Sequence, residues 1–588
     1  MMETTWDLSV FYKNFSDPAL RADMEALKSL TVEGHKLLAS ELPVVQKLEA
    51  LVRQLELLSN KYARAAMFAQ LTLSVEAENR EAFLTMEELS ALMVDLQVFQ
   101  SACTRYIGTV ENLDEVIAQS DTLKQNAFIL HEASQTAKHM LPESMEKWML
   151  RMSLSGGDAF QKLRDQLMGT ITVELNGESL PLPAVRGRAF DPDRSVRKSA
   201  FEAELAAYPK VALPMAFCLG GIKGEALTMC EAKGYPDVLT QQLEESRMDH
   251  DTLNAMWTAI REALPDFRRY LRAKGKLLGH SDGLPFYDLF APVGNDTQRY
   301  TIEEARDLLR DIFGKAHPKM ADFMLQAFDN RWIDLYPREG KEGGAFCSEN
   351  HEMKICRILS NFVGSFADVS TLAHELGHAW HAHCMQELPL LMAQPPMPLA
   401  ETASTFNETM LSHTVIASAD PERAFGLLEG ILMEATQCVV DIYSRFLFES
   451  AVFEARKTHT PAVEELRQMM LNAQEEVYGD GLDKEVRHAD MWINKGHYYT
   501  VGLHFYNFPY AFGLLFGLGV FQKYQQEGSA FLPRYDALLA RCGSDTVANV
   551  AASVGINVRS VDYWRSALDV LRAEIDEFET LAARRTAK

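Results

Sequence analysis

The sequence predicts a mostly α-helical protein. Along residues 1–150, apolar residues recur every three or four positions and prolines and glycines are few, which is typical of amphipathic helices. The same spacing returns over most of the remaining chain, and only two short stretches have the pattern of strands. At 588 residues, the chain can bury a large core and is long enough to form more than one domain.

The apolar spacing in the N-terminal part predicts long helices that pack antiparallel to one another. We expect them over residues 19–38, 43–73, 76–107 and 109–138. Histidines, cysteines and carboxylates do not cluster there. We therefore expect a structural role for this part, such as forming one wall of a channel.

A β-hairpin follows these helices. Between Gly169 and Pro183, β-branched residues alternate with other residues, and Asn176-Gly177 favours a tight type I′ turn. A further helix is expected over residues 195–207, and helices continue to about residue 280. We place a domain boundary near residue 190, so that residues 1–190 form an N-terminal helical region ending in the hairpin and residues 191–588 form a second domain.

The stretch from residue 337 to residue 366 is the second place where extended structure is expected. Gly340, Gly343 and Gly344 allow another backbone to approach closely, and residues 353–363 have partly extended character. An exposed strand edge could pair with the backbone of a peptide. An ordinary buried strand would give the same pattern, and the residues alone do not separate the two interpretations.

The stretch from Thr371 to His381 carries the clearest chemical signal. His374, Glu375 and His378 form the pattern H-E-x-x-H. Residues four apart lie on one face of a helix, so the two imidazoles can bind one zinc ion at about 2.0–2.1 Å. Glu375 lies beside them and can take a proton from a water that the metal has made acidic. The pattern predicts a zinc-dependent site that hydrolyses peptides.

A helix with surface histidines is the plain alternative, and the neighbouring residues argue against it. Asp368 and Ser370 can cap the start of a helix. The apolar residues around the motif have the spacing of a buried helix face. Gly377 costs about 1 kcal/mol relative to alanine inside a helix, and a glycine in such a place more often marks close packing.

A catalytic zinc site has a third protein ligand. His381 lies seven residues after the first ligand, about 10.5 Å along a helix, so His381 and His383 are expected on the helix surface or as supporting groups. The prolines of residues 394–398 interrupt the helix. A new helix then carries Glu401 in its first turn and Glu408 on the same face. Either carboxylate could bind the metal while the other orients a ligand histidine, although a solvated acidic face has the same spacing.

Further helices are expected over residues 421–457 and 461–478, and an aromatic-rich segment covers residues 497–510. Amide hydrolysis creates an oxyanion, which needs hydrogen-bond donors besides the metal. A tyrosine or histidine of this segment can supply one, although packing is the usual role of so many aromatic residues. The apolar run 508–521 is shorter than the ~20 residues that span a bilayer, so we expect it in the core.

The composition is that of an ordinary globular protein, with 47% hydrophobic and 24% charged residues. A formal charge of −24 argues against nucleic acid or an anionic membrane as a partner, because both would repel the chain. The basic start and apolar run of a secretory signal are not seen. The 8 cysteines are scattered without C-x-x-C pairs, which favours free thiols in a reducing compartment. We therefore expect a cytoplasmic protein.

The motif and its surroundings resemble a known family. His374-Glu375-x-x-His378 followed by Glu401-x-x-Ser404 is similar to the thimet oligopeptidase and neurolysin family of zinc peptidases, and more closely to its oligoendopeptidase F branch. Other family-like stretches are residues 340–347, 358–362 and 504–513. The resemblance extends from about residue 190 to the C-terminus, with a weaker N-terminal part.

The resemblance implies a fold and a set of metal ligands. The fold would be a neurolysin-like helical bundle in two parts, with a deep central groove and a small β-sheet next to the active-site helix. His374, His378 and Glu401 would bind one Zn²⁺ per chain, Glu375 would be the general base, and Glu408 would support the ligands. Residues 191–588 would then be the catalytic domain.

The resemblance also places oxyanion donors at His504 and Tyr510. Pro509 and Phe512 interrupt the run of tyrosines that the family pattern has at this point, so other donors stay open. These other candidates are His497, Tyr499 and Tyr506. The residues expected to contact the substrate are Gly343, Gly344, Ala345 and Tyr506.

Taken together, the sequence predicts a zinc endopeptidase that hydrolyses internal bonds of short peptides. A metallo-exopeptidase of the same chemistry, acting as aminopeptidase or carboxypeptidase, is the alternative, and peptides with a blocked N-terminus separate the two. A non-catalytic peptide-binding protein with a structural zinc is a third interpretation. Its function would survive Glu375→Gln, whereas the enzyme would lose about 10²–10⁴-fold in activity with its general base.

Overall fold

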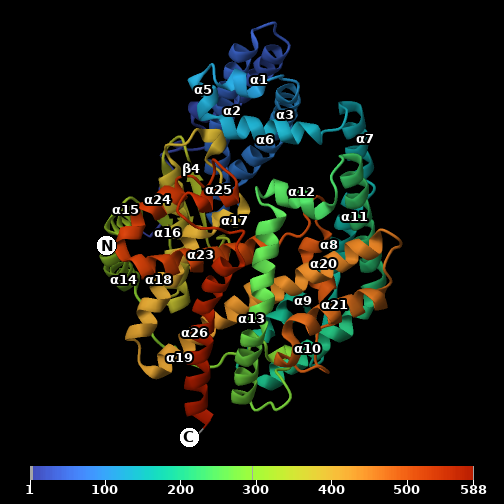
Figure 1. Ribbon diagram of the computed structural model, residues 1–588, viewed down its shortest axis with the longest axis vertical. Helices are drawn as coiled ribbons and strands as arrows, with labels where there is room; N and C mark the ends of the chain where they lie inside the picture. The colour runs from blue at the N-terminus through green and yellow to red at the C-terminus, as the bar shows by residue number, and fades with distance from the viewer. Residues whose placement is uncertain (1–3, 295, 587–588) are drawn as a thin grey trace.

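The computed structural model describes residues 4–294 and 296–586. Most of these residues lie in helices, and the strands form one two-stranded and one three-stranded sheet. The mostly α-helical class is therefore confirmed (Figure 1). All eight cysteines are free thiols, as expected.

The N-terminal helices form the upper part of the molecule in Figure 1. They are α1 (Pro18–Leu38), α2 (Val44–Val75), α3 (Arg80–Gly108), α4 (Leu113–Ile117), α5 (Asp121–Gln125) and α6 (Ala127–Lys138). The first three match the predicted helices, but the single helix expected over 109–138 is wrong. Asn112 adopts a left-handed backbone conformation with φ of 51°, and the Ser120 side chain caps a new helix by accepting a hydrogen bond from Leu123 N. Both features interrupt a continuous helix.

The β-hairpin follows α8 (Gly157–Thr170) in the chain. Strands β1 (Thr172–Leu175) and β2 (Glu178–Pro181) pair antiparallel. Asn176 and Gly177 both have positive φ, 54° and 84°, as a type I′ turn requires, so the predicted hairpin is confirmed. The hairpin packs on α10 (Arg194–Ala207) and contributes to the larger apolar core. The domain boundary near residue 190 stays a prediction.

Most of the remaining described residues lie in helices, apart from the three-stranded sheet and the loops. Those before the three-stranded sheet are α7 (Glu143–Ser153), α8 (Gly157–Thr170), α9 (Leu182–Gly187), α11 (Ala212–Ala232), α12 (Val238–Glu245), α13 (His250–Leu277), α14 (Ile302–Ala316) and α15 (Pro318–Asp329). Those after it are α16 (Phe366–Met385), α17 (Met397–Ala400), α18 (Thr402–Ser418), α19 (Pro421–Thr436), α20 (Ile442–Arg456), α21 (Val463–Tyr478), α22 (Met491–Asn494), α23 (Phe508–Glu527), α24 (Leu532–Leu539), α25 (Val547–Ala552) and α26 (Val561–Thr586). In Figure 1, α14–α16 and α18 lie on the left, α8, α11, α20 and α21 on the right, and α13 packs against α26 between them.

In the described part of the chain, no single helix is long and apolar enough to cross a bilayer. Arg194–Lys210 and Ala212–Ala232, bent by 70°, meet the criteria of length and composition only as a pair.

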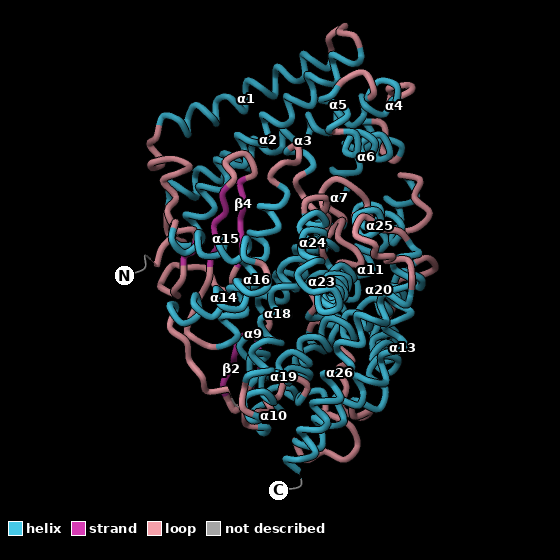
Figure 2. Tube along the Cα trace, turned by 60° about the vertical axis from the view of Figure 1, so that its left-hand side comes forward, coloured by secondary structure: helices cyan, strands magenta, loops and turns pink. Residues whose placement is uncertain are grey.

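The three-stranded sheet contributes residues to two of the three apolar cores that the described residues form. Its order is β3 (Ile333–Asp334), β5 (Ile355–Leu359), β4 (Phe346–Asn350), with β3 parallel and β4 antiparallel to β5. Successive side chains of a strand point to opposite faces. Leu359 packs with the N-terminal helices, whereas Cys356 and Ile358 belong to the larger core. Figure 2 shows β4 between α2 and α16, so this edge strand lies beside the helix that carries the H-E-x-x-H motif.

Helices α16, α18 and α23 pack closely at glycines. A Cβ atom at Gly377 of α16 would lie 2.7 Å from the carbonyl oxygen of Ala403 and from the Cα of Ser404. A Cβ at Gly513 of α23 would lie 3.0 Å from the Cβ of Glu401. Asn407 of α18 donates a hydrogen bond of 3.1 Å to the carbonyl oxygen of Ala373 in α16. The helix backbones can approach this closely only because the glycines lack side chains.

We expect Gly377→Ala to destabilise the protein, although alanine favours a helix by about 1 kcal/mol. The added methyl group meets backbone atoms of α18, which cannot rotate away, and overpacking of this kind costs about 1–3 kcal/mol. Gly430→Ala in α19 is the matched control, because a Cβ there has nothing within 4 Å. Thermal unfolding of both variants is the measurement, and an unchanged or higher midpoint for Gly377→Ala would contradict the packing argument.

Candidate metal centre

The helix that carries the motif, α16, starts earlier than expected. Ser365 is its N-cap residue, with extended backbone angles of φ −77° and ψ 163°. Its hydroxyl accepts a hydrogen bond of 3.1 Å from Asp368 N, and Asp368 Oδ2 accepts one of 2.8 Å from Ser365 N. The prediction of Asp368 or Ser370 as the cap is therefore wrong. Asp368 instead completes a capping box three residues after the cap.

Three side chains converge at the motif. His374 Nε2 and His378 Nε2 lie 3.1 Å apart, and Glu401 Oε2 lies 3.4 Å from each of them. Four ligands at about 2.0–2.1 Å around a tetrahedral zinc ion are separated from one another by roughly 3.3 Å. The triangle therefore has the dimensions of one face of such a tetrahedron. The residues fit a zinc ion with a fourth position left open.

The position of Glu401 follows from a break between two helices. Glu401 lies between α17 and α18, after the proline-rich stretch that ends the preceding structure. The Ser404 hydroxyl donates a hydrogen bond of 2.7 Å to Glu401 Oε2. This bond orients the carboxylate towards the two imidazoles, which explains why the spacing E-x-x-S accompanies the ligand.

Glu408 lies behind the first histidine. Its Oε1 is 3.4 Å from His374 Nδ1. A carboxylate at this place favours a proton on Nδ1 and leaves the Nε2 lone pair directed at the metal position. The sequence did not decide which carboxylate faces the metal position. In the structure, Glu401 lies beside the Nε2 atoms of both histidines, whereas Glu408 lies beside Nδ1 of His374.

Negative charge dominates the site. Burial alone would lower the pKa of His374, but Glu408, Glu401 and Glu375 outweigh it and raise the pKa to about 9. Burial works against ionisation of Glu401 as well, but the hydrogen bond and charge of His378, together with His374, lower its pKa to about 2. A site with three carboxylates around two imidazoles is suited to a cation.

Glu375 is 6% exposed, and its charge acts on a thiol of the edge strand. Burial raises its pKa, against the influence of the two histidines. The neighbouring thiol, Cys347 of β4, has its pKa raised by a hydrogen bond with Cys356 and by burial, with further contributions from Cys356 and Glu375. The general-base candidate is therefore close both to the two histidines and to Cys347 of β4.

The predicted oxyanion donors occupy two different surroundings. Tyr510 lies in the first turn of α23, where its hydroxyl forms a short contact with that of Tyr506. Burial raises the pKa of Tyr510, and the bond with Tyr506 and the charge of Glu401 add to the effect, so the hydroxyl keeps its proton. Gly513, one turn later, packs against Glu401. Tyr510 therefore lies close to Glu401, one of the metal-ligand candidates.

His504 lies in a separate buried cluster. Its Nδ1 is 3.1 Å from Lys223 Nζ, and its backbone N–H donates a hydrogen bond of 3.2 Å to Gln242 Oε1. In the part of the chain that the structure describes, His504 forms no hydrogen bond, ion pair or ring contact with the three metal-ligand candidates. Of the other candidates, Tyr499 is fully buried, and His497 has a buried Nε2 without a hydrogen-bond partner among the described residues.

The glycine-rich segment before β4 is open. A Cβ at Gly343 or at Gly344 would have nothing within 4 Å, and Gly344 has φ of 83°. Asn361 Nδ2 donates a hydrogen bond of 2.8 Å to the Gly344 carbonyl oxygen, which holds the segment against the end of β5. Ala345 follows at the start of the edge strand and is half-buried. The segment leaves room for another chain beside it.

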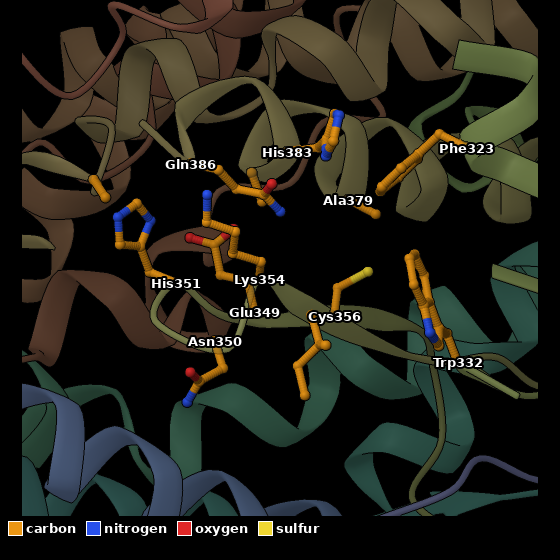
Figure 3. Close-up of a pocket in the computed structure, with 13 residues that line it drawn as sticks. Phe323, Trp332, Glu349, Asn350, His351, Lys354, Cys356, Ala379, His383 and Gln386 are labelled. Carbon is orange, nitrogen blue, oxygen red and sulfur yellow. The ribbon is translucent and has the colours of Figure 1, made fainter. Parts of the chain in front are cut away.

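A pocket lies further along α16, between its C-terminal half and the β4–β5 hairpin (Figure 3). Glu349, Cys356, His383 and Trp332 are among the residues that line it. The metal-ligand candidates are not among its lining residues, and the pocket is therefore separate from the site described above. His383, expected on the surface or as a supporting group, lines this pocket.

Sequence reasoning missed two buried residues next to His504. Lys223 and Glu449 form an ion pair of 2.6 Å between Nζ and Oε1, and Lys223 reaches the His504 ring. A signal for Lys223 was present, because it is the one lysine inside the apolar helix Ala212–Ala232. Its partner lies 226 positions away in the sequence, so nothing local could have identified the pair.

Comparisons with known proteins agree with the site. Residues 189–570, well over half of the chain, match the model of peptidase family M3. An oligoendopeptidase F homolog of Lactococcus lactis subsp. lactis (strain IL1403) is 25% identical over 614 residues, which cover 98% of this chain and 97% of that protein. Oligopeptidase PepF of Bacillus subtilis (strain 168) is 23% identical over 492 residues, covering 80% of this chain and 71% of that protein.

The fold is shared with solved structures. A candidate peptidase from Chlamydophila abortus superimposes with a TM-score of 0.85 at 22% sequence identity, over 98% of both chains. At 22% identity, the structural similarity establishes only the fold. Membership of the family rests on the match of residues 189–570 to the family model. The resemblance found in the sequence is thereby confirmed: the chain belongs to peptidase family M3 and is a metalloendopeptidase.

Proposed function

We propose that this chain is a zinc-dependent oligoendopeptidase, which hydrolyses internal bonds of short peptides. His374, His378 and Glu401 would hold the zinc ion, and Glu375 would be the general base. The observation that carries the proposal is the triangle of ligand atoms, 3.1 Å and 3.4 Å on its sides, with Glu375 next to it in α16. The names of the relatives, oligopeptidase and oligoendopeptidase, support short peptides as substrates.

Two nitrogen ligands and one carboxylate suit zinc, and the ion, when bound, would supply Lewis acidity to the attacking water and to the scissile carbonyl. Glu375 takes the proton of that water and passes it to the leaving amine. Its raised pKa, which burial causes, makes the Glu375 carboxylate a stronger base for the first transfer, from the water. Glu408 keeps His374 oriented through Nδ1.

Tyr510 and His504 are the proposed donors to the developing oxyanion. The Tyr510 hydroxyl keeps its proton and lies beside Glu401, which supports a place next to the reacting carbonyl. His504 lies six residues earlier, and its Nε2 is free among the described residues. Donors aimed at a developing charge are worth about 10²–10³-fold each in acyl transfer.

The peptide itself is proposed to lie along β4. This strand forms the edge of its sheet, and an edge can add the backbone of an extended peptide without regard to its sequence. Gly343, Gly344 and Ala345 lead into the strand and leave space beside it. Tyr506, whose hydroxyl meets that of Tyr510, is proposed to contact the substrate from the opposite side. Free cysteines and a charge of −24 support a cytoplasmic enzyme without a nucleic acid or membrane partner.

Peptides blocked at both ends should be cleaved at internal bonds. We expect mass spectrometry of an acetylated and amidated peptide library to show internal cleavage, which a chelator stops and added zinc restores. The N-termini are not needed because binding is proposed to use the peptide backbone along β4. Cleavage restricted to unblocked peptides, one end residue at a time, would favour the exopeptidase instead.

Glu375→Gln should abolish most of the activity while zinc remains bound. The side chain keeps its shape but loses its basicity, so kcat should fall about 10²–10⁴-fold. Zinc content, measured on the same preparation by mass spectrometry of metals, should stay at one ion per chain. Glu408→Gln is the contrasting variant, because it should weaken zinc binding about 10–100-fold. Full activity of Glu375→Gln would rule out its role as general base.

Zinc affinity should rise with pH up to about 9. His374 has its pKa raised to about 9, so the ring is protonated below that pH and zinc must displace the proton. Affinity should therefore increase about tenfold per pH unit from pH 6 until the competition ends near the pKa. Competition with a fluorescent chelator of known pH dependence measures this. Glu408→Gln should move the plateau to lower pH, and a flat profile for the unmodified protein would contradict the explanation.

A further inference from the structure

A buried lysine touches the His504 ring. Lys223 of α11 and Glu449 of α20 have side-chain exposures of 0% and 4%, and their Nζ and Oε1 lie 2.6 Å apart. Lys223 Nζ is also 3.1 Å from His504 Nδ1 and 5.0 Å from the centre of the Phe453 ring. A buried charge is costly unless it is paired, and this amine has a carboxylate at contact distance. We therefore treat the pair as an ammonium and a carboxylate.

The contact fixes the proton on the imidazole. An ammonium group can only donate hydrogen bonds, so His504 Nδ1 must be the acceptor. A neutral imidazole that accepts at Nδ1 carries its proton on Nε2. Burial and the charge of Lys223 hold the pKa of His504 well below its usual range, which keeps the ring neutral. Among the described residues, nothing accepts a hydrogen bond from Nε2.

The residue after His504 has a left-handed backbone conformation. Phe505 has φ of 51°, which is rare for a bulky residue and is found where the surroundings enforce it. Its ring stacks on Phe453 at 5.4 Å, and Phe453 also meets the edge of the His504 ring at 5.4 Å. The turn directs His504 towards Lys223, while Tyr506 on the other side of Phe505 meets Tyr510.

We propose that Lys223, held by Glu449, is a positioning residue of this peptidase. It fixes the His504 imidazole in the tautomer with the proton on Nε2, so that the ring offers a neutral N–H donor to the substrate. The inference rests on the proposed function, because it requires His504 to act on the reacting carbonyl. Without the ammonium, the other tautomer would direct a lone pair at the oxyanion.

The chain contains a matched control for this cluster. Lys274 and Glu429 form a second buried pair, with side-chain exposures of 0% and 6% and the same distance of 2.6 Å between Nζ and Oε1. Lys274 donates its next hydrogen bond to the carbonyl oxygen of Leu289, at 3.0 Å, and not to a histidine. Removing this pair tests what the loss of a buried lysine and glutamate does to the fold alone.

The test uses variants that remove both charges of a pair, so that no uncompensated charge stays buried. Lys223→Met/Glu449→Gln is compared with Lys274→Met/Glu429→Gln, in the full-length zinc-loaded protein. With a blocked peptide, we expect the Lys223 variant to lose at least about tenfold in kcat with little change in KM, because the donor acts in the transition state. The Lys274 variant should keep its kcat.

Combination with His504→Ala shows whether Lys223 acts through His504. We expect the Lys223→Met/Glu449→Gln/His504→Ala variant to be no slower than His504→Ala itself, because residues that act through one group are not additive. Additive losses would overturn the proposal, and so would a kcat equal to that of the Lys274 control. If Glu375→Gln is fully active, the proposed function fails and this inference falls with it.

The tautomer can be observed without measuring activity. In protein labelled with ¹⁵N-histidine, with the signals of His504 assigned through His504→Ala, we expect Nδ1 at the shift of an unprotonated ring nitrogen and Nε2 at that of an N–H. The reverse assignment in the unmodified protein would overturn the proposal, even if the Lys223 variant did not fold. Loss of this pattern in the Lys223 variant would support it.

Discussion

The close contact between Gly377 of α16 and the backbone of α18 brings the metal-ligand candidates together. Two of the proposed ligands come from α16 and the third, Glu401, directly precedes α18, and their atoms lie within 3.4 Å of one another. That is possible only if the helix axes approach more closely than side chains usually permit. Gly377 permits it on α16, and Gly513 permits α23 to close on Glu401 from the other side. The ligand triangle is thus a consequence of helix packing that glycines control.

Negative charge exceeds positive charge at the metal centre, whereas the buried lysine–glutamate pairs are balanced. Lys223 and Lys274 each have a carboxylate at 2.6 Å, so each pair is close to neutral by itself. Around His374, by contrast, three carboxylates act together and raise its pKa to about 9. His374, Glu401 and Glu408 have side-chain exposures of 27%, 28% and 33%, and an excess of negative charge among such partly buried groups favours a bound cation. The imbalance is therefore an argument for a metal ion that is independent of the motif.

The sequence was most informative where chemistry is local. His374, Glu375 and His378 fall within one helical turn, and the glutamate at residue 401 follows after a short proline-rich break. The cap of the same helix was misplaced by a few residues, because Ser365 and Asp368 form a reciprocal pair that single-residue preferences do not reveal. The division of roles between Glu401 and Glu408 needed the family resemblance, since spacing alone puts both on one face.

The resemblance pointed to His504 and Tyr510, but the different surroundings of these two residues could not be predicted. Residues six apart end in separate surroundings, because the left-handed turn at Phe505 directs His504 towards α11 and α20, while Tyr510 stays beside Glu401 of the metal centre. No periodicity in the sequence predicts that turn. Lys223, which contacts the His504 ring, lies 281 residues earlier in the chain. In Figure 1, α11 and α20 lie on the right and α16 and α18 on the left. If both residues donate to the same scissile carbonyl, that carbonyl receives hydrogen bonds from groups anchored on different sides of the fold. Hydrolysis would then depend on the relative position of the two sides.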